Sequence, residues 1–361
     1  MGFELPAYNA PDFSKEPLVS APDVRTAVVD RDGVAPEGFH AFSIYPEYFR
    51  ISGEWTLATE SRMDCVTVVR DSGSVDVVEF RRLRAGDRVV LGRSEDGSEG
   101  ICVHCTGFEC TECDGEIFSF RTGRSRETAY SKDYDTLYEL LRYERDHGSI
   151  VWVLGPAVVF DYDSREAMTT LIERGYVDAL LAGNALATHD LEGAMLGTAL
   201  GQDIYTQEQV RGGHYHHLEV INRARRSGSL EAFVRDHELS SGVICAALRR
   251  KLPIVLAGSI RDDGPLPGVC GNAYEAQDAM RTHLRRATTV VALATQLHTI
   301  ASGNMTPAFT VVDGWIRPVF IYSVDVSEFA VNKLRDRGSL EVVPIVANVQ
   351  DFLVHLKNRL D

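Results

Sequence analysis

The sequence has no long apolar run and little positive charge for its size. No stretch approaches about eighteen uninterrupted apolar residues, which excludes a typical transmembrane helix. Lys and Arg number 37 against 52 Asp and Glu, so the formal net charge is -15. This balance disfavours a nucleic-acid backbone as partner, because phosphate binding needs a basic surface. We therefore expect neither a membrane nor a nucleic acid as partner.

The first residues do not show the sequence patterns of a targeting segment. The first residues, MGFELPAYNAPDFSKEP, lack the basic stretch and apolar core of a secretory signal. Pro6 stands where the myristoylation pattern needs Ser or Thr. We therefore expect a cytoplasmic protein.

Cysteine is scarce, with seven residues in 361, and the odd number does not suit a disulfide scaffold. Four of the seven form two CxxC pairs: Cys102, Cys105, Cys110 and Cys113. Paired CxxC presents thiolates to tetrahedral zinc, so the cluster predicts a structural zinc site. The gap between the pairs is shorter than in most zinc ribbons. An iron–sulfur cluster or four reduced thiols are the alternatives.

No GxGxxG follows any predicted strand, so the common dinucleotide fingerprint is missing. The chain is long enough for two domains, and the pattern of apolar and polar residues changes near residue 130. Residues 1–40 predict an extended arm, and residues 41–130 predict a small, mainly antiparallel β domain. Residues 131–361 alternate apolar strands with helices, which indicates a parallel sheet covered on both faces. The predicted fold class is α/β, with a Rossmann-like domain preceded by a small, mainly β domain.

Glycine and polar residues gather directly after the predicted strands of this α/β domain. Open parallel sheets bind ligands outside the carboxyl ends of their strands. One such strand end would be an ordinary tight turn, but five consecutive ones favour a binding site. The residues that we expect to line a bound cofactor are Gly155, Pro156, Gly183, Asn184, Ala185, Gly258, Ser259, Thr295, Gly303, Asn304 and Asp325.

Charged residues near these strand ends are candidates for substrate binding and proton transfer. Arg261 and Asp262 follow the strand at 253–259, where Arg could clamp a carboxylate and Asp could accept from an amine. A surface ion pair is the alternative. His189 and Asp190 form a candidate proton-transfer pair at a helix start, with helix capping as the alternative role.

The sequence also predicts two helix starts, and it contains a glycine spacing and a histidine group. Asp163 or Ser164 is expected to cap a helix over 163–175, and Thr188 a helix over 188–200. Glycines at every fourth residue favour close helix packing: Gly193, Gly197 and Gly201. Three histidines lack a Cys or carboxylate at ligand spacing, so a polar pocket wall is a better interpretation than a metal site. They are His214, His216 and His217.

Seven strings together resemble one family: AGNALATHDLEGA, GGHYHHLEVIN, VLAGSIRDDGPLP, AQDAMR, ATQLHTIASGNMTP, VNKLRDRGS and NVQDFL. This is the family defined by the conserved LOR/SDH region (lysine-oxoglutarate reductase/saccharopine dehydrogenase). It includes archaeal-type ornithine cyclodeaminases and the C-terminal part of the cyanobacterial arginine dihydrolase/ornithine cyclodeaminase. The resemblance covers residues 148–355, and VLAGSIRDDGPLP is long and unusual enough to be specific.

The resemblance implies an NAD-binding domain of deoxyhypusine-synthase-like fold, which accounts for the missing GxGxxG. Family members with known activity convert ornithine to proline and ammonia, with NAD oxidising and then re-reducing the substrate. The sequence departs from the family in two places. SGEWTLATES stands where a GHLxDS-like string is usual, and SVDVSEF keeps Asp325 but lacks the Asn-Pro of a VDINP-like segment. The four-cysteine insertion is not a family feature.

The first hypothesis is therefore an NAD-dependent cyclodeaminase that acts on ornithine or a related basic amino acid. In it Arg261 clamps the substrate carboxylate, Asp190 and Asp262 are candidates for base or amine anchor, and His298 is a further proton carrier. The second hypothesis is a net NAD-dependent amino-acid or imine dehydrogenase that releases NADH. The third is a non-catalytic NAD-sensing protein. We expect a small-molecule amino-acid substrate and a homo-oligomer.

Overall fold

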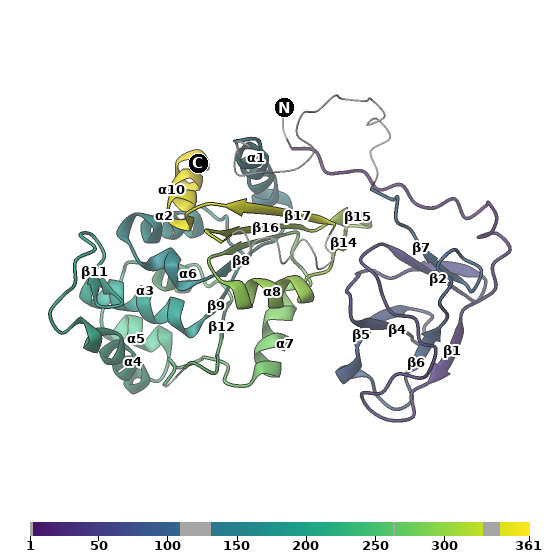
Figure 1. Cartoon of the computed structure of the whole chain (residues 1–361), viewed down its shortest axis with the longest axis horizontal. Helices are drawn as coiled ribbons and strands as arrows, with labels where there is room; N and C mark the ends of the chain where they lie inside the picture. Colours follow the sequence, from purple (N-terminus) through teal and green to yellow (C-terminus); the bar gives the residue numbers. More distant parts are fainter. Residues whose placement is uncertain (1–2, 109–130, 263, 328–339) are drawn as a thin grey trace.

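The computed structural model describes residues 3–108, 131–262, 264–327 and 340–361. An all-β part is followed along the chain by a larger α/β part (Figure 1). The α/β part contains a six-stranded parallel sheet, and the β part contains small antiparallel sheets, which confirms the predicted fold class. Among the described residues, no helix combines the length and apolar character needed to cross a membrane.

The β part consists of short strands with strongly apolar inner faces. Its strands are β1 (Arg25–Val28), β2 (Glu47–Ile51), β3 (Glu54–Leu57), β4 (Cys65–Val69), β5 (Val75–Glu79), β6 (Arg88–Leu91) and β7 (Ile101–Val103). One antiparallel sheet has the order β1-β6-β4-β5, and the other has the order β3-β2-β7. Phe49, Val90 and Ile101 are fully buried in one of its two small cores.

The segment before β1 contacts both parts of the molecule. It is shorter than the predicted arm of residues 1–40, because β1 pairs with β6 inside a sheet. The Phe3 ring packs against Tyr143 and Phe320 of the α/β part, with ring centroids 5.7 and 5.6 Å apart. Phe13 stacks on Trp55 of the β part at 5.4 Å. Aromatic packing of this segment therefore links the two parts.

The parallel sheet has the strand arrangement of dinucleotide-binding folds. Its strands are β8 (Ile150–Leu154), β9 (Ala179–Gly183), β12 (Ile254–Ala257), β13 (Thr289–Leu293), β16 (Phe320–Asp325) and β17 (Glu341–Val346). They lie in the order β12-β9-β8-β13-β16-β17, and every neighbouring pair is parallel. Numbered along the chain, this order is 3-2-1-4-5-6, as in the Rossmann fold. The order reverses between β8 and β13.

Helices cover both faces of this sheet. They are α1 (Ser131–His147), α2 (Tyr162–Glu173), α3 (Asn184–Leu196), α4 (His216–Ser227), α5 (Leu230–Asp236), α6 (Val243–Arg249), α7 (Ala273–Leu284), α8 (Gln296–Met305) and α10 (Val349–Arg359). In β8, Ile150, Trp152 and Leu154 face the core shared with α1, α2, α3 and α10. Val151 and Val153 face the second core, with α7 and α8 (Figure 1). Apolar strands with two buried faces are what a covered parallel sheet requires.

Two predicted helix starts are wrong. The N-cap of α2 is Asp161, whose side chain accepts from the backbone N–H of Ser164, so the helix begins ahead of Asp163. Thr188 does not cap a helix, because α3 already begins at Asn184 and Thr188 lies buried in its interior. The N-cap of α2 lies two residues before Asp163, and that of α3 is Gly183, which has no capping side chain.

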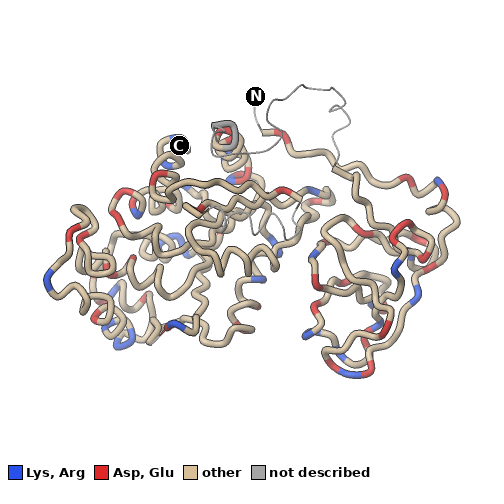
Figure 2. Tube along the Cα trace, in the orientation of Figure 1, with Lys and Arg blue, Asp and Glu red and all other residues tan. Residues whose placement is uncertain are grey.

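The β part contacts the edge of the sheet at which the strands begin. Ser61 accepts a backbone hydrogen bond from Ala308 (3.2 Å), and Glu60 makes an ion pair with Arg285. Glu60 also forms a β-bridge with Thr310 of β14 (Phe309–Val312), which pairs with β15 (Trp315–Pro318). These segments lead into the amino ends of β13 and β16, so the carboxyl ends lie at the opposite edge. Acidic and basic residues are spread over both parts (Figure 2).

Candidate functional site

The carboxyl edge of the parallel sheet gathers most of the residues that the sequence pointed to. Gly155 follows β8, and Thr295 follows β13, so they flank the point where the strand order reverses. Ligands of open α/β sheets bind at this point. We call these residues together the strand-end site: Gly155, Pro156, Gly183, Asn184, Ala185, Gly258, Ser259, Arg261, Asp262, Thr295, His298 and Asp325.

Two glycines of the strand-end site are fixed by close approach. A Cβ atom at Gly155 would lie 1.9 Å from the backbone oxygen of Ala294, so the loops after β8 and β13 pack backbone against backbone. A Cβ at Gly183 would lie 2.9 Å from Cε1 of His298. No larger residue fits at Gly155 without moving a main chain, and Gly183 leaves the space that His298 occupies.

The helices that begin at the strand-end site have uncapped amino ends. Gly155, Gly183 and Thr295 are the N-caps of the 3-10 turn Pro156–Val159, of α3 and of α8. None of these ends has a capping side chain or an acidic residue in its first turn. By contrast, α2, α7 and α10 are each capped by an Asp or Asn side chain. Free N–H groups and the positive helix end favour an anion, so this edge suits a phosphate or pyrophosphate.

The loop after β12 is held in place from α3. Oδ1 of Asn184 accepts a hydrogen bond from the backbone of Leu266 at 3.0 Å, and both groups are buried. Within the loop, Asp262 accepts from the backbone N–H of Ser259 at 2.8 Å. Arg261 is exposed, and among the described residues its guanidinium makes no ion pair. The loop therefore presents a charged side chain on a fixed backbone.

His298 is the titratable group of the strand-end site with a shifted pKa. Its Nδ1 lies 3.2 Å from Oγ1 of Thr295. Burial lowers the pKa of His298 below its usual value, and the carboxylate of Asp262 opposes that shift. The imidazole is therefore neutral at pH 7 and retains the ability to accept a proton.

Asp190 is engaged by hydrogen bonds within the fold. It is fully buried in α3, where Oδ1 accepts from Nε of Arg165 at 2.7 Å and from the backbone of Val243 at 3.0 Å. Oδ2 accepts from the backbone of Ile244 at 2.7 Å. Asp190 therefore caps α6 and neutralises Arg165 of α2. This is a capping role, although the capped helix is α6 and not the helix on which Asp190 lies.

His189 pairs with Glu192 one turn further along α3, at 2.8 Å. Glu192 also accepts from Oγ1 of Thr198 (2.8 Å) and the backbone of Gly201 (3.0 Å), and Thr198 contacts His216 (2.8 Å). Burial alone would raise the pKa of Glu192, but these hydrogen bonds outweigh it and lower the pKa. The spacing of His189 and Glu192 by three residues is the sequence signal that was overlooked.

Gly303 and Asn304 do not lie at the strand-end site. They belong to the last turn of α8, about 13 Å along the helix from Thr295 at 1.5 Å per residue. The four-residue glycine spacing is not a helix-packing stripe either. Gly193 packs against Arg165 within α3, whereas Gly197 and Gly201 adopt positive φ in the turn that follows.

The cysteine cluster lies partly outside the described residues. Cys102 is buried in β7 and Cys105 is exposed just after it, while Cys110 and Cys113 fall in the undescribed segment 109–130. Among the residues that the structure does describe, no three His, Cys, Asp or Glu side chains are grouped as a metal site requires. The predicted zinc site is therefore unsupported. Two cavities of about 450 and 360 Å³ are lined by none of the residues of the strand-end site.

Comparison with known proteins identifies the family. Residues 136–356 match the family model described as arginine dihydrolase ArgZ-like, C-terminal, Rossmann fold. The chain belongs to this ArgZ-like family. Residues 46–127 match the model of the first region of the same C-terminal part. The resemblance inferred from the seven sequence strings is therefore confirmed.

Three proteins similar to this chain are informative. Ornithine cyclodeaminase of Methanopyrus kandleri is 38% identical over 347 residues, which are 95% of this chain and 79% of the relative. A conserved LOR/SDH protein of Methanococcus maripaludis superposes with a TM-score of 0.85 at 32% identity, covering 94% of this chain and 98% of that one. The third is the bifunctional arginine dihydrolase/ornithine cyclodeaminase AgrE of Nostoc sp., 38% identical over 94% of this chain.

AgrE is also known as a ternary complex with ornithine and NAD+. That complex superposes on this chain with a TM-score of 0.59 at 36% identity, covering 95% of this chain and 46% of AgrE. The chain therefore spans about half the length of this bifunctional relative. The AgrE complex shows NAD+ and ornithine bound to one ArgZ-like protein.

Proposed function

We propose that this protein is an NAD-dependent ornithine cyclodeaminase. The observation that carries the proposal is the ArgZ-like match over both parts of the chain, joined to a strand-end site built for a dinucleotide. Relatives that this chain covers along most of their length are ornithine cyclodeaminases. The reaction converts ornithine to proline and ammonia, with no net change in the oxidation state of the cofactor.

The residues at the strand-end site fit NAD. The pyrophosphate would meet the uncapped ends of α3 and α8, and Gly155 lets the backbone approach it closely. We propose that Asn184, Ser259 and Asp325 line the cofactor. The chemistry that bound NAD+ would supply is reversible hydride transfer at the Cα of the substrate.

The side chains around this position would bind and deprotonate the amino acid. Arg261 would hold the α-carboxylate through two parallel hydrogen bonds. Asp262 would accept from the α-ammonium group, and neutral His298 would take its proton. Loss of that proton leaves the amine lone pair that an imine requires. Asp190 has no part in these steps, because its carboxylate is engaged in the fold.

The test is turnover of L-ornithine by the purified protein supplied with NAD+. We expect equal amounts of proline and ammonia and no accumulation of NADH. NADH that accumulates in proportion to ornithine consumed would instead identify a net dehydrogenase. Absence of ammonia release from a panel of basic amino acids would contradict the proposal. Calorimetric titration with NAD+ separates failure to bind the cofactor from failure to turn over.

Two finer expectations belong to this proposal. We propose that the protein is a homo-oligomer, since its carboxyl edge exposes apolar side chains such as Leu297 (68% exposed). The zinc site stays a prediction from the CxxC pairs. Elemental analysis of protein purified without chelator should find about one zinc per chain if the four cysteines bind it, and trace metal if they are thiols.

A further inference from the structure

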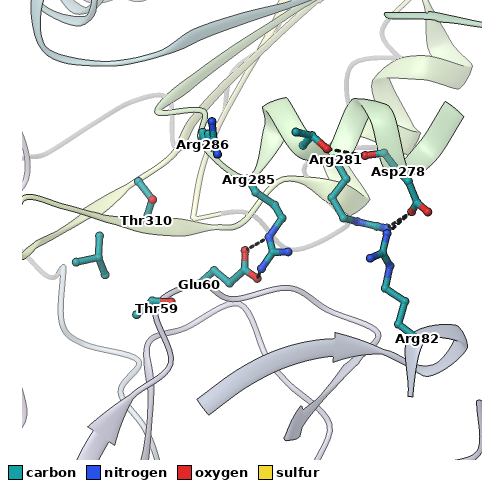
Figure 3. A pocket seen from close by; sticks show the side chains of 10 residues that line it. Thr59, Glu60, Arg82, Asp278, Arg281, Arg285, Arg286 and Thr310 are labelled. Carbon is teal, nitrogen blue, oxygen red and sulfur yellow. Dashed lines mark hydrogen bonds and ion pairs between the residues drawn. The ribbon is translucent and has the colours of Figure 1, made fainter. Parts of the chain in front are cut away.

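A polar cavity of about 450 Å³ lies between the β part and the α/β part (Figure 3). Glu60 and Arg82 line it from the β part, whereas Asp278, Arg281 and Arg285 line it from α7 and the residue after its end. These α7 residues lead into the amino end of β13. The cavity therefore lies at the opposite edge of the sheet from the strand-end site, and it has no place in the proposed reaction.

Six arginines line this cavity or lie beside it; five of them share three carboxylates, and Arg286 makes no ion pair among the described residues. The arginines are Arg62, Arg81, Arg82, Arg281, Arg285 and Arg286. Glu79 makes ion pairs with three of them, Asp278 with three and Glu60 with one, so two of the carboxylates are divided among several partners. Among the described residues these pairs leave an excess of three positive charges, on a chain whose net charge is -15.

The arginines repel one another at this position. Burial lowers the pKa of Arg281, and the charges of Arg62, Arg81 and Arg82 lower it further against the pull of Glu79. Arg286 is exposed at the cavity and, among the described residues, makes no ion pair. Threonine hydroxyls at Thr59 and Thr310 add hydrogen-bond donors to the same lining, whereas the hydroxyl of Thr282 donates to the backbone oxygen of Asp278.

We propose that this cavity binds a small dianion, such as a phosphate monoester or a dicarboxylate, as an effector that bridges the two parts of the chain. Arginine is the residue that pairs bidentately with carboxylate and phosphate. A dianion would offset most of the excess charge and would contact Arg82 on one side and Arg285 and Arg286 on the other. It would therefore tie the β part to the α/β part.

The test uses inorganic phosphate and 2-oxoglutarate as probes of the full-length protein. Each is titrated by calorimetry at constant ionic strength with chloride as the balancing ion, with and without saturating NAD+. We expect saturable binding to the wild type that survives saturation with NAD+. Arg286→Gln should weaken it about tenfold, as loss of a charge-assisted hydrogen bond would.

Matched variants keep the result interpretable. Arg286 makes no ion pair among the described residues, so Arg286→Gln should leave the circular dichroism spectrum and NAD+ binding unchanged. Arg226→Gln, at an exposed position on α4, is the control and should bind both probes like the wild type. The proposal is overturned if neither probe binds the wild type saturably. It is equally overturned if Arg286→Gln binds as the wild type does, or if Arg226→Gln loses as much.

Discussion

Arg261 stands at the tip of the loop after β12 with its guanidinium unpaired among the described residues. If it holds the α-carboxylate of the substrate, Lys cannot reproduce its two parallel hydrogen bonds. Arg261→Lys should therefore cost on the order of 2–4 kcal/mol, or roughly 30- to 1,000-fold in kcat/KM for ornithine. NAD+ affinity and the melting temperature should stay close to those of the wild type.

Steady-state kinetics with calorimetric NAD+ titration checks this expectation. The alternative, a surface ion pair, predicts modest kinetic effects and a lowered melting temperature. Near wild-type turnover of the Lys variant would remove Arg261 from the strand-end site.

The pH profile should report the influence of the Asp262 charge on His298. Burial holds the pKa of His298 below its usual value, so the active neutral imidazole is lost only as the pH falls through that lowered pKa. The carboxylate of Asp262 opposes the shift, so Asp262→Asn should lower the pKa of His298 further. The acid limb of kcat/KM should then move to lower pH, by on the order of half a unit.

The informative quantity is the pH at which kcat/KM falls on the acid side, rather than the maximal kcat/KM. Asp262→Asn will also reduce the maximal rate if Asp262 anchors the substrate amine. A limb that stays in place or moves to higher pH would show that His298 is not the titrating base.

At the scale of helices and strands, Asp190 joins three elements through one carboxylate. It lies on α3, pairs with Arg165 of α2 and caps α6. Asp190→Asn removes the charge that compensates Arg165, and breaking a buried pair costs about 3–5 kcal/mol. Urea unfolding should show this loss of stability. Asp236→Asn, in an exposed pair with Arg235, is the matched control and should change stability by about 0.5 kcal/mol or less.

A stable Asp190→Asn variant that lost turnover selectively would contradict this assignment. It would restore Asp190 to the chemistry that its position beside His189 had suggested. Loss of stability therefore indicates a structural carboxylate, and selective loss of turnover indicates a catalytic one.

The helices and strands of the α/β part could be predicted because its strands are apolar runs and most of its helices show helical spacing of apolar residues or a capping residue. The runs at 150–154 and 289–293 became β8 and β13 because both faces of the sheet are buried. The start of α3 could not be predicted from caps, because its N-cap, Gly183, has no capping side chain. The hydrogen-bond partners of Asp190 could not be predicted either, because Val243 and Ile244 lie more than fifty residues further along the chain.

At the scale of the whole molecule, the β part and the strand-end site lie at opposite edges of the sheet. The described β part therefore does not cover the position at which ornithine would react. Hydride transfer to a cofactor works best where water is excluded. The same edge exposes apolar side chains at three successive strand ends, namely Ile260, Leu297 (68% exposed) and Val326 (70% exposed). Exposed apolar residues around a reactive site are typical of a surface that another chain covers.

We therefore expect a second copy of this chain to cover the strand-end site. Light scattering coupled to size-exclusion chromatography should give a mass of at least two chains. Ile260→Asp combined with Leu297→Asp should shift the protein toward the monomer and lower turnover in the same preparation, because a buried charge opposes association. Val28→Asp, at an exposed apolar position on β1, should leave both mass and turnover unchanged. A wild-type monomer with full turnover would show instead that the strand-end site closes without a partner.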